Sequence, residues 1–230
     1  MLPENAVNIK VRVKFSKTGS LKFISHLDLN RTMQSSFLRS KLPIWYSEGF
    51  NPHPKVVFSP PLSVGVSSLT EFVDFKMVAA VPADEVIERL NASFPKGLRA
   101  HACYTPVTRF CDIKWGLYEI KYELTGDVPA DICEKAENIL SQKEIMMEKF
   151  SKKTGTKMVN IAEGIRFCGA ELVGNILTVH AKLSCDDATF VNPRYIGEIL
   201  CASMPDVFTG AEEEACRMSV YLDDGETLFE

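Results

Sequence analysis

The chain has 230 residues, of which 46% are hydrophobic and 24% are charged, as is typical of a folded protein with a core of ordinary size. Its seven cysteines are an odd number and include no CxxC pair, which argues against a disulfide framework and favours reduced thiols. No apolar run reaches the roughly 18 residues that cross a bilayer, and the first residues do not resemble a secretory signal. We therefore expect a cytoplasmic protein with no membrane partner.

The net charge of −4 conceals two halves of opposite sign. Residues 1–105 contain 13 Lys and Arg against 8 Asp and Glu, a charge of +5, whereas residues 106–230 contain 13 against 22, a charge of −9. Within the first 60 residues the count is 9 against 3. A basic half of this kind suits a polyanion or an acidic partner, although a solvated basic surface would look the same.

The first half of the chain shows the periodicities of three strands, two helices and a further strand-like piece. IKVRVKF alternates apolar and polar residues, which predicts a half-buried strand. Ser25, three positions before Asp28, predicts a capped helix start, and apolar residues then recur every four positions. The expected order is strand, helix, strand, strand, helix, strand, at residues 9–15, 25–42, 44–47, 71–77, 82–94 and 98–104.

The second half repeats this order. YEIKYEL alternates, a helix follows Pro129, and Gly174-Asn175 is a typical hairpin turn between two apolar runs. A helix capped by Asn192 and a last alternating strand complete the repeat. The expected elements are strands at 118–124, 166–173, 176–183 and 216–222, helices after 129 and 192, and a possible extra strand at 144–150.

Two βαββαβ halves predict an α+β protein built from two tandem ferredoxin-like units with antiparallel sheets. The expected domains are a basic N-terminal one at residues 1–108 and an acidic C-terminal one at residues 114–230. The boundary should lie in the connection at residues 106–114.

Residues 46–66, YSEGFNPHPKVVFSPPLSVGV, interrupt the first half with four prolines. Proline fixes its own backbone angle and lacks an amide donor, so this segment cannot form a helix or a central strand. Asn51, His53 and Lys55 lie among the prolines. The segment is either a stiff binding loop with pre-ordered polar groups or a stiff connection that discourages pairing at a sheet edge.

Motifs for catalysis and cofactors are scarce. Ser25, His26 and Asp28 could suggest a triad, but residues this close at a helix start usually cap the helix. His101 and Cys103, two positions apart on one expected strand, could contribute to a zinc site only together with a third group. There is no Walker loop, no GxGxxG and no CxxxCxxC. We therefore expect neither a metal nor a cofactor.

The remaining candidates form an N-terminal set suited to RNA. Cationic side chains would pair with phosphates, and exposed aromatic rings would stack on unpaired bases. The candidate binding residues are Lys10, Arg31, Arg39, Trp45, Phe50, Asn51, His53 and Lys55. The acidic stretch PDVFTGAEEE in the second half would repel phosphate, so RNA contacts should be confined to the first half.

The stretches FSKTGSLKFISHLDLNRTM and YSEGFNPHPKVVFSPPLSVGVSSLTEFVDF resemble the radical-SAM-linked protein family, a bacterial domain of unknown function found alone or attached to a radical-SAM protein. The resemblance is dense over about residues 9–78. It implies cytoplasmic location, cooperation with a separate radical-SAM protein and a connection to RNA or translation. The family motif, to which no role is assigned, corresponds to Ser25, His26, Leu27, Asp28, Gly49, Phe50, Asn51, Pro52, His53, Pro54 and Lys55.

Three functions remain open from the sequence. The first is a non-catalytic accessory protein that binds tRNA or ribosomal RNA and presents it to a radical-SAM partner. The second is an RNA-processing or RNA-modifying enzyme with His26 and His53 as acid and base, since imidazole titrates near neutral pH. The third is a protein-interaction module whose basic face meets an acidic protein.

Overall fold

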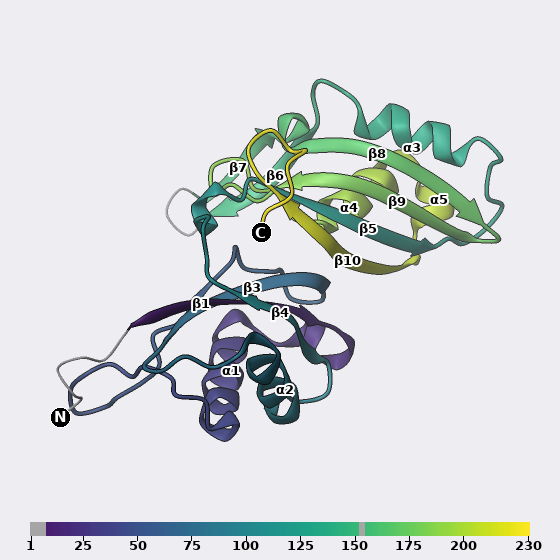
Figure 1. Ribbon diagram of the computed structural model, residues 1–230. Helices are drawn as coiled ribbons and strands as arrows, with labels where there is room; N and C mark the ends of the chain where they lie inside the picture. Colours follow the sequence, from purple (N-terminus) through teal and green to yellow (C-terminus); the bar gives the residue numbers. More distant parts are fainter. Residues whose placement is uncertain (1–7, 152–154) are drawn as a thin grey trace. The chain divides into compact units, whose positions relative to one another are not determined.

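The computed structural model describes residues 8–151 and 155–230, and it divides the chain into two compact units (Figure 1). Unit 1 extends to Asp112 and includes Glu230, and unit 2 comprises Ile113–Phe229. The division lies inside the connection 106–114 expected from the sequence. Both units are mixed α+β structures with antiparallel sheets.

Unit 1 places its two long helices on one face of a four-stranded sheet (Figure 1). Its elements are β1 (Ile9–Lys17), a 3-10 helix (Gly19–Phe23), α1 (His26–Ser40), β2 (Val57–Phe58), β3 (Ser67–Met77), α2 (Ala83–Ser93), β4 (Leu98–Tyr104) and a 3-10 turn (Phe110–Asp112). The strand order is β4-β1-β3-β2, with antiparallel neighbours throughout.

Strand alternation and helix periodicity build the core of unit 1. Val11, Val13 and Phe15 of β1 are buried in one cluster with Met33 and Phe37 of α1. The predicted helix start is confirmed, because the Ser25 hydroxyl accepts a hydrogen bond from the Asp28 amide. The intervening residues of β1 point to the opposite face of the sheet, which the helices do not cover.

The expected strand at 44–47 is wrong in part. Ile44 makes a single bridge to Met77, and the chain then leaves the edge of β3 before it returns as the two-residue β2. The pairing with β3 ends because Tyr46 bridges to Pro54 and the Ser47 amide donates to the His53 carbonyl, so the chain pairs with itself. The excursion, residues 47–53, is hereafter the edge loop, and it extends away from the sheet in Figure 1.

Unit 2 repeats the strand order of unit 1 and adds a hairpin. Its elements are β5 (Trp115–Glu123), α3 (Ile132–Leu140), β6 (Met146–Ser151), β7 (Gly155–Asn160), a 3-10 turn (Ala162–Gly164), β8 (Ile165–Val173), β9 (Ile176–Ser184), α4 (Arg194–Ser203), α5 (Pro205–Phe208) and β10 (Glu212–Tyr221). The sheet order is β10-β5-β9-β8, and β6 pairs with β7 separately.

The outcome for unit 2 differs from expectation in the hairpin. Gly174, with φ of 63°, forms the predicted turn between β8 and β9, because glycine adopts positive φ without strain. The sequence indicated β6 but not its partner β7, whose side chains are all exposed and therefore show no apolar alternation. No helix in the described ranges is long and apolar enough to span a membrane.

Candidate nucleic-acid interface

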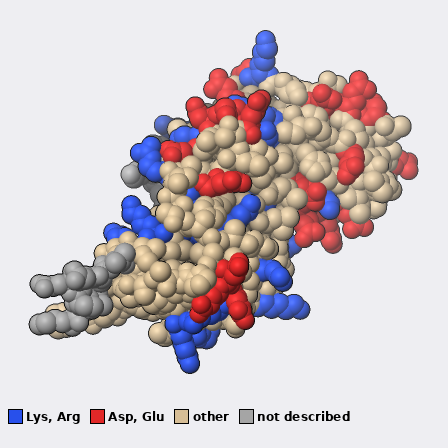
Figure 2. All heavy atoms as spheres, in the orientation of Figure 1, with Lys and Arg blue, Asp and Glu red and all other residues tan. Residues whose placement is uncertain are grey.

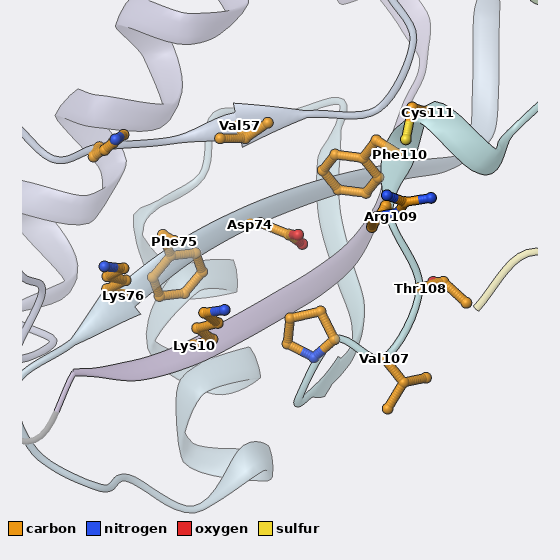
Figure 3. Close-up of a pocket in the computed structure, with 12 residues that line it drawn as sticks. Lys10, Val57, Asp74, Phe75, Lys76, Val107, Thr108, Arg109, Phe110 and Cys111 are labelled. Atoms are coloured by element: carbon orange, nitrogen blue, oxygen red, sulfur yellow. The ribbon is translucent and has the colours of Figure 1, made fainter.

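A pocket of about 580 Å³ opens on unit 1 beside β1, β2 and β3 (Figure 3). One wall is the segment 106–111, which follows β4. Figure 3 shows Lys10 and Lys76 near each other at one end of the pocket, with Arg109 and Phe110 at the other end. The pocket therefore combines cationic side chains with apolar walls.

Strand register brings the pocket's charges together. Lys10 pairs with Lys76 and Arg12 with Asp74 across β1 and β3, and Val57 of β2 pairs with Asp74. Residues that are opposite each other in neighbouring strands share a face of the sheet. These five residues therefore lie on the face that the helices leave open.

Asp74 lines the pocket, and Arg12 holds it in place from behind the pocket wall. The Arg12 guanidinium is 1% exposed and binds the Asp74 carboxylate through two hydrogen bonds of 2.8 and 2.9 Å. It also donates to the Thr108 hydroxyl at 2.7 Å and to the Thr108 carbonyl at 2.9 Å, and it lies 4.4 Å from the Phe110 ring centre. These contacts hold the segment 106–111 against the sheet. They also neutralise the only carboxylate among the residues that line the pocket.

The remaining pocket charges are positive. Lys10 and Lys55 are exposed, and the described residues place no carboxylate within ion-pair distance of either. The Lys76 ammonium lies 5.6 Å from the Trp45 ring centre, which positions it by a cation–π contact. Arg109 is partly neutralised by Asp112 at 3.2 Å. Three lysines therefore dominate the electrostatic field of the pocket.

The edge loop is held in one shape next to this pocket. Tyr46 bridges to Pro54, and the Ser47 amide donates to the His53 carbonyl at 2.9 Å. The His53 ring nitrogen Nδ1 lies 3.2 Å from the Ser47 hydroxyl and 3.1 Å from the Asn51 carbonyl. At the tip, Phe50 is fully exposed. The loop thus presents an aromatic ring to solvent from a pre-ordered backbone.

The structure divides the residues predicted to bind RNA into two groups. Lys10 and Lys55 line the pocket and Trp45 contacts Lys76, while Phe50, Asn51 and His53 belong to the adjoining edge loop.

Arg31 and Arg39 lie apart from the other candidates, on α1, which covers the opposite face of the sheet. Arg31 pairs with Asp28 at 3.2 Å, and Arg39 donates to the Ser93 carbonyl of α2 at 2.7 Å. The structure therefore does not bring the two arginines together with the other candidates, because sequence proximity does not reveal the face of the sheet.

Sequence reasoning missed Lys76, Thr108, Arg109 and Phe110. Lys76 could have been found from the alternation of β3, since it has the same parity as Asp74 and the opposite parity to buried Phe75 and Met77. The other three lie in the connection after β4, where no periodicity indicates which side chains return to the sheet.

The candidates for catalysis are not gathered into one site. Ser25 caps α1 and donates to Asp28 at 2.7 Å, as capping predicted. The His26 ring packs edge-on against Phe58 at 5.3 Å, whereas His53 belongs to the edge loop, which leaves β3 near Lys76. The two imidazoles therefore lie at different points along the sheet edge.

The structure also separates His101 from Cys103. The register of β4 against β1 shifts next to them, His101 lies 2.9 Å from the Ser16 hydroxyl, and Cys103 packs against the core. Burial raises the pKa of the Cys103 thiol to about 11, which disfavours the thiolate that zinc requires. Among the described residues, no three His, Cys, Asp or Glu side chains are grouped to hold a metal ion.

Comparison with known proteins yields one family and a number of solved structures, among them the two that follow. A family model described as "Uncharacterized protein conserved in bacteria (DUF2344)" matches residues 10–193. No curated protein matches the chain. The structure titled "Crystal Structure of a Cbf5-Nop10-Gar1 Complex" is 13% identical with a TM-score of 0.48, over 91% of this chain and 48% of that one. An unknown protein from Galdieria sulphuraria is 7% identical with a TM-score of 0.26, over 91% and 98%.

The chain spans about half the length of the first of these structures. Both TM-scores are below 0.5, so neither likeness carries an argument about function.

Proposed function

We propose that unit 1 of this chain, which belongs to an uncharacterised family conserved in bacteria, binds single-stranded RNA. The proposal rests on the geometry of the unit 1 pocket. The observation that carries the proposal is the meeting of Lys10, Lys55 and Lys76 at one apolar pocket beside the edge loop. Their charge would bind phosphates, and the pocket would accept an unstacked base.

The edge loop supports a single-stranded ligand over a duplex. Phe50 is a fully exposed aromatic side chain at the tip of a hydrogen-bonded loop, and such a ring offers a surface on which any base can stack. A duplex keeps its bases stacked on one another, so it could use the lysines but not this ring. We therefore propose that the ligand contains unpaired nucleotides, as the loops and ends of tRNA and ribosomal RNA do.

Unit 2 would contribute little to this binding. Figure 2 shows several separate groups of acidic side chains on its visible surface, and β10 begins with three consecutive glutamates, residues 212–214. Carboxylates repel phosphates, so we confine the proposed RNA contacts to unit 1.

The fold type and the cellular role of the chain belong to the same proposal. The strand orders β4-β1-β3-β2 and β10-β5-β9-β8 support an interpretation of the chain as two tandem ferredoxin-like units. The resemblance over about residues 9–78 supports a cytoplasmic accessory role beside a separate radical-SAM enzyme, to which the chain would present its RNA. The chain itself would not perform the chemistry.

The experiment is a fluorescence anisotropy titration of labelled tRNA and of a labelled single-stranded oligoribonucleotide at several salt concentrations. The test variant is Lys10→Glu/Lys55→Glu, which reverses two exposed pocket charges. The control is Arg31→Glu/Lys96→Glu, which changes the net charge equally at two exposed positions outside the pocket. We expect the test variant alone to weaken binding, with a salt dependence reduced by ~0.7 in log–log slope for each lost phosphate contact.

Two results would contradict the proposal. Equal weakening by both variants would mean that only net charge matters. If the chain binds RNA no more tightly than it binds an unrelated acidic protein of similar size, the result would instead favour the protein-interaction module.

A further inference from the structure

A second, smaller pocket lies within unit 2, on the helix-facing side of its sheet. Its volume is about 190 Å³, and its walls come from β5, α4, α5 and β10. Tyr122 and Glu213 are direct cross-strand neighbours in β5 and β10, so their side chains leave the sheet on the same side. Glu213 is an exposed residue that lines the pocket, so it offers a carboxylate there.

The Tyr122 hydroxyl points into this pocket but has no hydrogen-bond partner among the described residues. The residue is 2% exposed. The Phe208 ring packs edge-on against it at 5.4 Å, which fixes the orientation of the phenol. A buried hydroxyl left without a partner is destabilising, so native structures usually provide one, including a ligand or an ordered water.

Gly197 of α4 makes room for both groups. A methyl group at this position would collide with the Glu213 carboxylate oxygen Oε2 and would lie 3.4 Å from the Tyr122 hydroxyl oxygen. The phenol and the carboxylate therefore converge on the space that the missing side chain leaves. A helix interior normally disfavours glycine relative to alanine, but here only glycine leaves room for the Glu213 carboxylate beside Tyr122.

We infer that this pocket binds the primary ammonium group of a small aliphatic amine, with the Glu213 carboxylate and the Tyr122 hydroxyl oxygen as its acceptors. An ammonium group has three donors and no acceptor, which matches a site made of oxygen atoms. The Tyr122 and Phe208 rings would add a favourable aromatic environment for the positive charge.

The other charged groups leave the pocket negative. Arg194 and Glu198, one turn apart on α4, pair with each other at 2.9 Å, so their charges largely cancel. Glu213 is then the uncompensated charge. A divalent cation fits less well, because Ca²⁺ and Mg²⁺ require six or more oxygen ligands and this pocket supplies few.

Pocket size selects a short chain. The volume of about 190 Å³ is less than the ~300 Å³ at which pockets for drug-sized ligands begin. The ligand class is therefore an alkylamine or diamine, or the amino end of a longer chain.

The binding should depend on pH. Burial raises the pKa of the Glu213 carboxyl to about 7, and Glu198 also raises it while Arg194 lowers it. Burial likewise raises the pKa of Tyr122 well above its ordinary value, so the phenol stays neutral. Because the ammonium requires the ionised carboxylate, affinity should increase as the pH rises through about 7. Tyr122 from β5, Arg194, Glu198 and Cys201 from α4, and Glu213 itself are the titratable and charged groups that line the pocket.

The test is an NMR titration of the full chain with n-butylamine at millimolar concentration, with n-butanol as the neutral probe of the same shape. Tyr122→Phe should weaken n-butylamine binding roughly five-fold, and Glu213→Gln more than about ten-fold. The matched control is Tyr104→Phe, which removes the other buried hydroxyl without a partner among the described residues, in unit 1. It should leave the affinity unchanged.

Gly197→Ala provides a second test that keeps both acceptors. Its methyl group would overlap the Glu213 carboxylate oxygen and displace it from Tyr122, so binding should be lost while the helix itself is retained. Equal binding of n-butanol and n-butylamine, or binding that survives Glu213→Gln and Gly197→Ala, would overturn the inference. If n-butylamine at about pH 8 caused no NMR chemical-shift change, the inference would also be overturned, and the pocket would be one that holds water. None of these outcomes bears on RNA binding by unit 1, so the two proposals fail independently.

Discussion

The two units share a strand order but place their polar groups on opposite sides of the sheet. In unit 1 the lysines of the pocket lie on the open face, and the helix-facing side is an apolar core. In unit 2 the unusual polar groups, Tyr122 and Glu213, lie on the helix-facing side beside α4. Topology alone therefore does not locate a site, because the same arrangement of strands offers several places for one.

The two pockets also differ in charge. The unit 1 pocket is positive because Arg12 neutralises Asp74 and leaves the lysines uncompensated. The unit 2 pocket is negative because Arg194 pairs with Glu198 and leaves Glu213 uncompensated. In each pocket one ion pair cancels two of the charges and so decides the sign of the pocket's net charge. Removing or reversing the charge of single side chains therefore tests the difference between the two pockets.

The largest effect should follow removal of the buried ion pair in unit 1. Arg12→Ala leaves Asp74 without its partner and frees the segment 106–111, so the free energy of unfolding of unit 1 should fall by about 3–5 kcal/mol. Urea denaturation measures the loss. Arg31→Ala, which breaks an exposed pair, is the control and should change stability by no more than about 0.5 kcal/mol. Similar losses in both variants would show that Arg12 does not hold the pocket together.

The next effect concerns binding and should leave stability unchanged. Phe50→Ala removes a fully exposed ring, so folding should be unaffected while the affinity for single-stranded RNA falls by about 1–3 kcal/mol. Anisotropy titration and a thermal melt together measure the two quantities. Leu38→Ala on α1 removes a similarly exposed apolar side chain away from the pocket and should alter neither. An unchanged affinity after Phe50→Ala would remove the edge loop from the RNA site.

A smaller effect should appear in unit 2 and should depend on pH. The pKa of Glu213 is raised by burial from its ordinary value of 4.5 to about 7, so the folded form retains a proton that the unfolded form releases between these values. Its contribution to stability is therefore complete below about pH 4.5 and is lost as the pH rises to about 7. Glu213→Gln should be more stable than the parent at about pH 8 and nearly equal to it at about pH 4.

The size of this gain is limited by solvent. Part of the Glu213 side chain is exposed, so we expect about 1 kcal/mol at most. Thermal melts across the pH range measure it, and Glu198→Gln, which removes an exposed carboxylate from the same pocket, is the control. A stability difference between Glu213→Gln and the parent that does not vary with pH would contradict the raised pKa.

The smallest effect separates capping from catalysis at the start of α1. Ser25→Ala removes the hydroxyl that accepts from the Asp28 amide and should lower the free energy of unfolding by about 1 kcal/mol. RNA affinity should stay the same, because Ser25 is not part of the pocket. Ser25→Asn retains a capping group and should restore most of the stability. Loss of a defined RNA product in Ser25→Ala, with stability unchanged, would favour an enzyme.

Local patterns were enough to anticipate most of the elements. Strand alternation in β1, the cap at Ser25 and the Gly174-Asn175 turn depend on residues close in sequence, so each could be predicted before any packing is known. The exposed strand β7 could not be predicted in this way, because a strand without a buried face has no apolar alternation. The truncation of the 44–47 strand depends on a bond from Ser47 to His53 within the loop, which takes the place of pairing with β3.

By itself, the sequence determined the four longer helices, though not α5, as well as most of the strands, the opposite charges of the two halves and the concentration of polar groups in the proline segment. The tertiary structure alone decided which of those groups meet. Register placed Lys10 opposite Lys76 and Tyr122 opposite Glu213, residues far apart in the chain, while it left Arg31 and Arg39 on the helix side. The physical reason is that secondary structure follows from local backbone and side-chain preferences, whereas a site requires strand pairing over long sequence separations, which no local pattern encodes.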